Sequence, residues 1–176
     1  SSKAHSYQRY STIEKGVNFH WPAGKKMGLS LTFDDARLSQ IDKGIPLLDK
    51  YNVKATFYVS PDNMEQRIEG WKKAVKNGHE IGNHSLVHPC SGNFAWSKGR
   101  AIEDYTLKNM FAELDSASRI IENQLGVIPS SYAYPCGQTF VGKAQETQSL
   151  VPLVSAMFES GRTFMAEAPN DPAFCD

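Results

Sequence analysis

The chain has 176 residues, of which 40% are hydrophobic, a size and composition typical of a single globular domain. Its 19 Lys and Arg residues balance its 19 Asp and Glu residues, so the charge gives no reason to expect nucleic acid or an anionic membrane surface as a partner. No apolar run approaches the roughly 20 residues that a membrane-spanning helix needs.

Residues 1–26 are polar and aromatic without a clear period. We expect them to form an N-terminal arm, with one short strand near 17–20, ahead of a single domain over 27–176. The first residues lack the apolar segment of a signal peptide, which leaves a cytoplasmic protein and a chain whose leader has been removed as alternatives. The odd number of cysteines does not decide between them; they are Cys90, Cys136 and Cys175.

Strand-like and helix-like segments alternate along the domain. Alternating or β-branched residues predict strands over 27–33, 54–59, 80–83, 130–134 and 163–167. Helical periodicity predicts helices around 45–52 and over 64–76, 101–125 and 143–158. This alternation predicts an α/β fold with a parallel sheet, in which the active site lies at the carboxyl ends of the strands.

Polar side chains follow three of these predicted strands. Asp34 and Asp35 end the first, His84 follows the third, and Pro135-Cys136-Gly137 follows the fourth. The carboxyl ends of parallel strands meet at one edge of a sheet, so these residues should lie together.

His84 and His88 have the spacing of a metal-binding pair. A helical turn would bring both rings to one side, and Pro89 should end that turn at His88. Such a pair in isolation is more often two surface histidines, and Asp34-Asp35 in isolation is more often a solvated turn or a helix N-cap. Their shared position at the edge of the sheet favours a metal site instead.

In that site one carboxylate would join the two histidines as a metal ligand, leaving a coordination position for water. The neighbouring carboxylate would be free to act as a base. Zinc lowers the pKa of a bound water to about 7. A backbone N–H after Pro135 could bind the oxyanion of a substrate carbonyl.

Three segments resemble the first motifs of the NodB-homology polysaccharide deacetylases (carbohydrate esterase family 4). They are Thr32-Phe33-Asp34-Asp35, His84-Ser85-Leu86-Val87-His88 and Tyr134-Pro135-Cys136-Gly137. The resemblance extends over about 27–167. It implies a distorted (β/α) barrel and a metal-dependent hydrolase that removes N- or O-acetyl groups from a polysaccharide or oligosaccharide.

By motif position, the resemblance makes Asp34 the catalytic base and Asp35, His84 and His88 the metal ligands. It makes the backbone N–H of Cys136 the oxyanion donor. The implied metal is Zn²⁺, with Co²⁺ or Ni²⁺ as alternatives. The implied location is extracytoplasmic: secreted, periplasmic or at the cell surface.

The chain departs from the family pattern in the third motif. The family's arginine, two residues before the proline, is replaced by Ala133, so nothing in this motif orients Asp34. The family's aromatic residue is replaced by Cys136, which removes a ring from the substrate groove. We expect Cys136 to be a buried structural thiol rather than a nucleophile.

A second departure concerns the later motifs, which supply a histidine as general acid. No histidine follows His88, and His79 is expected to be structural or exposed. We therefore expect a barrel that lacks its last strands. The alternatives are a non-catalytic carbohydrate-binding relative and a metal-dependent amidohydrolase of a non-polysaccharide substrate. Of the three tryptophans, Trp96 is the one favoured to contact a sugar ring.

Overall fold

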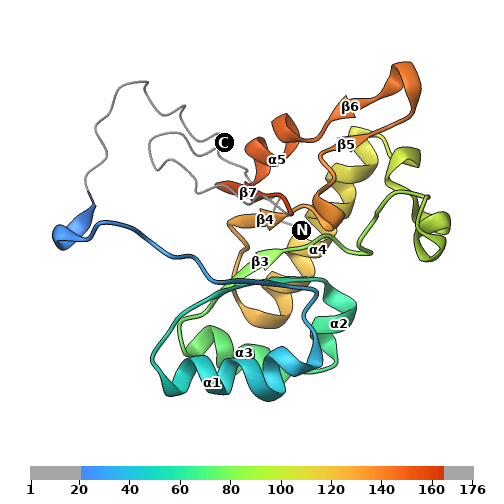
Figure 1. Cartoon of the computed structure of the whole chain (residues 1–176). Coiled ribbons are helices and arrows are strands. Elements are labelled where there is room, and N and C mark those ends of the chain that lie inside the picture. Colours follow the sequence, from blue (N-terminus) through green and yellow to red (C-terminus); the bar gives the residue numbers. More distant parts are fainter. Residues whose placement is uncertain (1–20, 165–176) are drawn as a thin grey trace, which may run out of the picture.

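The fold is built on a five-stranded, fully parallel sheet. A computed structural model describes residues 21–164; the predicted strand near 17–20 and the end of the strand predicted over 163–167 lie outside these residues. The order across the sheet is β1-β2-β3-β4-β7 (Figure 1). The bounds are β1 Thr32–Asp34, β2 Thr56–Val59, β3 Glu80–Asn83, β4 Ser131–Ala133 and β7 Ser160–Arg162.

The strands follow one another across this sheet in chain order. Within residues 21–164, the antiparallel hairpin of β5 (Phe140–Val141) and β6 (Gln148–Ser149) is the one pair of strands outside it. Sequential parallel strands form β/α barrels, whereas the strand order of a doubly wound sheet reverses part-way. The predicted α/β class with a parallel, barrel-type sheet is confirmed.

Helices connect the strands. The α-helices are α1 Ile45–Lys50, α2 Pro61–Glu65, α3 Ile68–Lys76, α4 Leu107–Leu125 and α5 Val151–Met157. A π-helix, Gln40–Gly44, runs into α1. Single 3-10 turns lie at Pro22–Gly24, Ala95–Arg100, Ile102–Asp104, Pro135–Gly137 and Ala144–Glu146. No helix within the described residues 21–164 is long and apolar enough to cross a bilayer.

Two apolar clusters share α4. Its C-terminal half packs Ile121 and Leu125 against residues of β2 and α3, including Phe57 and Trp71. Its N-terminal half joins β4 and α5 in a second cluster whose members include Met110, Leu114, Tyr132, Val154 and Phe158. Figure 1 shows α1, α2 and α3 gathered beside β1–β3, and α5 with the hairpin beside β4 and β7. The longest helix therefore joins the two halves of the sheet.

The first strand is shorter than predicted. Met27 and Leu29 are 77% and 84% exposed, and the strand begins only at Thr32. Of the alternating apolar residues before Thr32, only Leu31 packs against the core, and β1 pairs with β2 alone within the described residues. Periodicity predicted the direction of the strand but overestimated its length.

Two of the predicted helices have different bounds in the structure. The helix predicted over 64–76 is divided at Arg67, whose φ of −141° is not helical. The helix predicted from 101 begins at Leu107, since the Thr106 side chain accepts the N–H of Asn109 in a capping box. It ends, as predicted, at Gly126, which has a φ of +72°.

The helix predicted over 143–158 is wrong in its first half. That part is the β5–β6 hairpin, and α5 starts only at Val151 with Pro152 in its first turn. Proline has no backbone N–H and is tolerated in a first turn but not in a helix interior, so the helix cannot extend upstream. The last strand lies at 160–162 rather than at 163–167. The prediction missed it because the sequence Ser-Gly-Arg lacks the β-branched and aromatic residues that indicate a strand.

His79 is structural, in agreement with one of the two predicted roles. It is buried, its Nδ1 accepts the N–H of Ala55 at 3.3 Å, and its Nε2 donates to Asp49 at 3.1 Å. These contacts tie the start of β3 to α1 and β2, so His79 takes no part in the edge of the sheet where His84 lies.

Gly82 lies in β3, directly before the histidine loop, and allows a test of how closely this strand is packed. A Cβ at this position would lie 2.4 Å from the Tyr58 ring and 2.8 Å from Ser131 Oγ, whereas one at Gly99 would meet nothing within 4 Å. We expect Gly82→Ala to lower the free energy of unfolding by about 1–3 kcal/mol. Urea denaturation measures the change, with Gly99→Ala as the control. Equal stability of the two variants would contradict this packing.

Candidate metal centre

Asp34 and Asp35 lie in a tight turn at the end of β1. Asp35 and Ala36 have φ values of +75° and +51°, a left-handed conformation that is uncommon without glycine. Two amide side chains hold the turn: Gln40 Nε2 donates to the carbonyl of Asp34 at 2.5 Å, and Asn63 Nδ2 donates to that of Asp35 at 2.9 Å. The backbone that carries the two carboxylates is therefore held by residues from two following helices.

His84 and His88 lie in an irregular loop after β3, so the predicted helical turn is wrong. Ser85 and His88 have positive φ values, of 64° and 53°. The loop is closed instead by side chains: Asn83 Oδ1 accepts the N–H of Ser85 at 2.7 Å, and Ser85 Oγ accepts that of His88 at 3.0 Å. These bonds compete with helix formation and still bring both rings to one side.

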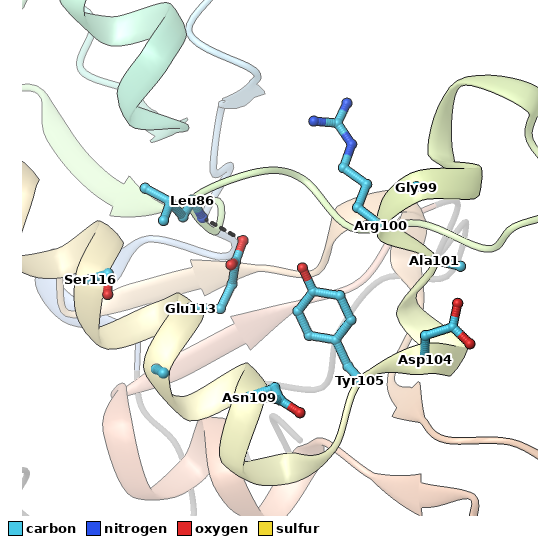
Figure 2. A pocket seen from close by; sticks show the side chains of 10 residues that line it. Leu86, Gly99, Arg100, Ala101, Asp104, Tyr105, Asn109, Glu113 and Ser116 are labelled. Carbon is cyan, nitrogen blue, oxygen red and sulfur yellow. Dashed lines mark hydrogen bonds between the residues drawn. The ribbon is translucent and has the colours of Figure 1, made fainter.

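A buried carboxylate from α4 supports the same loop. Glu113 Oε1 accepts the backbone N–H groups of Leu86 at 3.1 Å and Val87 at 2.7 Å, the first of which is drawn in Figure 2. Burial raises the pKa of Glu113, while the two N–H donors favour its charged form. The sequence analysis missed Glu113; its signal was an acid at helical spacing within the apolar stripe that includes Met110 and Ala117.

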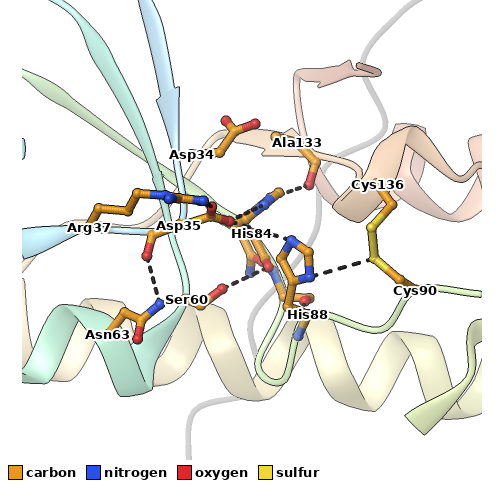
Figure 3. Close-up of polar contacts among 12 residues, drawn as sticks. Asp34, Asp35, Arg37, Ser60, Asn63, His84, His88, Cys90, Ala133 and Cys136 are labelled. Atoms are coloured by element: carbon orange, nitrogen blue, oxygen red, sulfur yellow. Dashed lines mark hydrogen bonds and ion pairs between the residues drawn. A yellow bond between two sulfur atoms is a disulfide. The ribbon is translucent and has the colours of Figure 1, made fainter. Parts of the chain in front are cut away.

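The histidine rings converge on Asp35. Its Oδ1 lies 3.4 Å from Nε2 of His84 and 3.5 Å from Nε2 of His88, and the two rings are 4.8 Å apart (Figure 3). Arg37 donates to the other carboxylate oxygen at 2.9 Å. The structure therefore brings together the three side chains that the sequence analysis gave as metal ligands.

The tautomers of these histidines fit a bound cation. His84 Nδ1 lies 2.8 Å from the carbonyl oxygen of Ala133, which can only accept, so Nδ1 carries the proton of the neutral ring. His88 Nδ1 lies 3.6 Å from the disulfide sulfur of Cys90, which carries no proton either. When each ring is neutral, Nε2 is then the nitrogen left to bind a cation beside Asp35, and contacts of this kind at the other ring nitrogen orient metal-binding histidines.

The protonation states fit as well. Contact with His84, followed by that with Arg37, holds the pKa of Asp35 well below its usual range, so this carboxylate is ionised. Burial is the main cause that lowers the pKa of His88 and favours the neutral ring. Metal ligands must be deprotonated, and one carboxylate with two imidazoles is a donor set suited to zinc and similar divalent ions.

Asp34 has an arginine partner from outside the third motif, a partner that the sequence analysis did not foresee. Arg162, the last residue of β7, forms an ion pair with Asp34 Oδ1 and lies over the Tyr58 ring. Its strand pairs with β4 so that Arg162 lies directly opposite Ala133. The guanidinium thus comes from the neighbouring strand at the level of the motif position, a pairing that sequence spacing could not reveal.

Cys136 is not a free thiol, contrary to the prediction. It forms a disulfide with Cys90, which lies 46 positions earlier in the sequence, and the two Cα atoms are 5.9 Å apart. Cys90 follows the histidine loop after β3, and Cys136 follows β4. These strands are neighbours, so their following loops meet. The disulfide links the loop of the two histidines to the loop of the predicted oxyanion donor.

Residues 22–150 match the family model for polysaccharide deacetylase, which covers more than half of the chain. The chain belongs to the polysaccharide deacetylase family. This confirms the resemblance found in the three motifs and places the chain in a family of hydrolases that act on acetylated carbohydrates.

Two deacetylases are among the similar characterised proteins. Chitin deacetylase 1 of Cryptococcus neoformans is 26% identical over 143 residues, which are 80% of this chain and 28% of that protein. The peptidoglycan-N-acetylglucosamine deacetylase PgdA of Listeria monocytogenes is 26% identical over 119 residues, which are 67% of this chain and 23% of that protein. The chain thus spans less than a third of the length of these curated relatives.

Solved structures of deacetylases share the fold. Peptidoglycan deacetylase PdaC from Bacillus subtilis, solved as a mutant, is 25% identical with a TM-score of 0.54, covering 73% of this chain and 55% of that one. A putative polysaccharide deacetylase from Mycobacterium smegmatis, 18% identical, has a TM-score of 0.60 and covers 82% of this chain and 53% of that one. The second likeness concerns the fold alone.

Glu113 allows a test of how the histidine loop is held. We expect Glu113→Ala to weaken zinc affinity by about 10- to 100-fold, the usual cost of losing an outer-shell contact. Glu113→Gln keeps an oxygen that accepts both N–H groups and should stay within a few-fold of the parent. Competition with a chromophoric chelator measures both. Equal affinities in the two variants would show that Glu113 does not support the loop.

Proposed function

We propose that the chain is the metal-binding part of a deacetylase that hydrolyses N- or O-acetyl groups on a polysaccharide or oligosaccharide. The observation that carries this proposal is the convergence of three possible metal ligands. Asp35 Oδ1 lies 3.4 Å from Nε2 of His84 and 3.5 Å from Nε2 of His88. Its family membership and the deacetylases among its relatives support the reaction class.

In this proposal Asp35, His84 and His88 hold one divalent ion, most suitably Zn²⁺, with Co²⁺ or Ni²⁺ as alternatives. When bound, such an ion acts as a Lewis acid and lowers the pKa of a bound water. The residues that surround it then decide how the substrate is oriented and where protons move.

Asp34 is the proposed base. It lies next to the ligand Asp35 and is not itself one of the three converging ligands, so its carboxylate can take a proton from the attacking water. The ion pair with Arg162 holds this carboxylate in one orientation. The leaving nitrogen or oxygen needs a proton in return, and in this proposal Asp34 returns the one that it received.

The oxyanion donor is proposed to be the backbone N–H of Cys136. This residue follows β4 in a left-handed conformation, with a φ of +55°, and its side chain is fixed by the disulfide to Cys90. A donor held by rigid covalent structure does not have to reorganise as charge develops on the carbonyl oxygen, which is how oxyanion holes stabilise a transition state.

The proposed substrate is an acetylated glycan outside the cytoplasm. Relatives named for chitin and for peptidoglycan N-acetylglucosamine support an acetylated amino sugar. The Cys90–Cys136 disulfide supports the location, since disulfides persist in secreted, periplasmic and cell-surface proteins and are rare in the cytosol.

Two substitutions separate metal binding from turnover. We expect His84→Ala to abolish stoichiometric zinc binding, whereas Asp34→Asn should keep the metal and lower acetate release by about 100-fold or more, the usual contribution of a general base. Metal analysis and acetate release from chitooligosaccharide, acetylated xylan and simple amides measure the two effects.

The same panel distinguishes the alternatives. Zinc retained by His84→Ala would contradict the ligand assignment. Glycan binding without acetate release under any metal or pH would favour a non-catalytic carbohydrate-binding protein. Turnover of the simple amides alone would favour a non-polysaccharide amidohydrolase.

Arg162 allows a test of how the base is positioned. Arg162→Met removes the guanidinium but keeps a long side chain, and we expect kcat to fall by about 10- to 100-fold, because small displacements of a catalytic group have effects of this size. Zinc stoichiometry and KM should change little. Arg162→Lys should recover part of kcat. A loss of zinc together with kcat would instead indicate a general disturbance of the site.

A further inference from the structure

Three donor atoms of metal-ligating type lie together beside the ring of His88. The two sulfurs of the Cys90–Cys136 disulfide and a nitrogen of His88 all lie within 4.8 Å of one another. Cys90 is fully buried, whereas Cys136 and His88 are half-buried. We call these three residues the cysteine–histidine cluster. It borders the candidate metal centre and shares His88 with it (Figure 3).

The spacing within the cluster matches that of zinc ligands. Sγ of Cys90 lies 3.6 Å from Nδ1 of His88. A tetrahedral zinc ion, with bonds of about 2.3 Å to sulfur and about 2.0 Å to nitrogen, holds its sulfur and nitrogen ligands roughly 3.5–3.6 Å apart. Two thiolates on the same ion lie roughly 3.8 Å apart. The cluster therefore has the arrangement of three zinc ligands, apart from the bond between its two sulfurs.

Contacts other than the disulfide keep the two cysteines near each other. The N–H of Ser91 donates to Oε1 of Gln138 at 2.7 Å, which joins the residue after Cys90 to the segment after Cys136. Ser97 Oγ accepts the N–H of Cys90 at 3.1 Å and donates to its carbonyl at 2.7 Å. The two segments also follow the paired strands β3 and β4. Reduction of the disulfide would therefore leave both thiols close together.

The imidazole of His88 can serve only one of the two sites at a time, because a neutral ring has a single nitrogen lone pair. When Nδ1 binds a metal beside the sulfurs, Nε2 carries the proton and faces Oδ1 of Asp35, 3.5 Å away. A carboxylate at the second nitrogen of a zinc-bound histidine is a common outer-shell arrangement. The Trp96 ring lies 5.8 Å from that of His88, on the loop after Cys90. Asp35 is thus a suitable partner for His88 in either state.

A dithiol reductant would convert the disulfide into metal ligands. Attack of its first thiolate on Sγ of the half-buried Cys136 breaks the sulfur–sulfur bond and gives a mixed disulfide with the reductant, and Sγ of Cys90 leaves with a proton. The second thiol of the reductant then displaces Cys136, so that the reductant becomes a disulfide and both cysteines become thiols. Zn²⁺ displaces the two thiol protons on binding. Thiolates and imidazole are the ligands that zinc favours in closed protein sites.

We infer that reduction of the Cys90–Cys136 disulfide creates a second zinc site, formed by both sulfurs and Nδ1 of His88, which withdraws His88 from the candidate metal centre. The existence of this site follows from the cluster alone. Its consequence for turnover rests on the proposed function: the oxidised chain releases acetate, and the reduced chain loses this activity as zinc moves to the thiolates.

Cobalt distinguishes the two sites, because its bonds to thiolates give a charge-transfer absorption in the near ultraviolet that oxygen and nitrogen ligands do not give. The test uses the whole chain with Cys175→Ser, which removes the third thiol, and His84→Ala, which removes a ligand of the candidate metal centre but none of the cluster. After reduction with dithiothreitol and its removal under nitrogen, this protein should bind stoichiometric Co²⁺ with strong charge-transfer absorption. The oxidised form of the same protein should show no such absorption.

Further substitutions in this background test the ligands one by one. Cys136→Ser and His88→Ala should each weaken Co²⁺ binding by the reduced protein by more than about 100-fold, since the loss of an outer-shell contact alone costs about 10- to 100-fold. Unfolding of the reduced protein, seen by circular dichroism, would overturn the site. Absence of the charge-transfer absorption, or unchanged Co²⁺ affinity in His88→Ala, would overturn it as well.

The effect on turnover needs a control for the loss of the disulfide itself. Cys90→Ala/Cys136→Ala lacks both the disulfide and the thiolates, so with one equivalent of zinc it should release acetate at least about 10-fold faster than the reduced parent, in which His88 is withdrawn. Equal rates would overturn the withdrawal of His88. Absence of acetate release from the oxidised parent would instead contradict the proposed deacetylase activity, and the cobalt spectra would decide the second site independently.

Discussion

Oδ1 of Asp35 lies 3.4 Å from Nε2 of His84 and 3.5 Å from Nε2 of His88, and contacts from several elements hold the three side chains in this position. The carbonyl of Ala133 accepts from Nδ1 of His84, and Nδ1 of His88 lies 3.6 Å from the disulfide sulfur of Cys90, so Nε2 of each ring is turned toward Asp35. One carboxylate and two imidazoles this close together form a donor set suited to a divalent cation. Their enforced convergence is the strongest physical argument for a metal centre.

The support for this centre comes from several levels of the fold. The parallel strands β1, β3 and β4 end at one edge of the sheet. The buried Glu113 accepts backbone N–H groups of the histidine loop, and the Cys90–Cys136 disulfide links the segment after that loop to the loop after β4. The register between β4 and β7 then places Arg162 opposite Ala133, where it pairs with Asp34. The geometry around the proposed base therefore depends on a strand that carries no recognisable motif.

The sequence predicted those parts of the molecule that depend on local pattern. The α/β class, β3 at its observed bounds, the end of α4 at Gly126 and the meeting of Asp35 with the two histidines all follow from periodicity, turn chemistry and the rule that parallel strands end at one edge. The remainder depends on contacts between distant positions. The partner of Cys136, the arginine of Asp34 and the role of Glu113 each join residues that share no local signal, and Pro152 outweighed helical periodicity in the segment before α5.

The measurement that bears most directly on the metal centre is a crystal structure of the zinc-loaded protein with anomalous data collected at the zinc edge. The account predicts one strong anomalous peak, with Asp35 oxygen and the Nε2 atoms of His84 and His88 each about 2.0–2.2 Å from it. A peak elsewhere, or coordination through Nδ1 of either histidine, would contradict it.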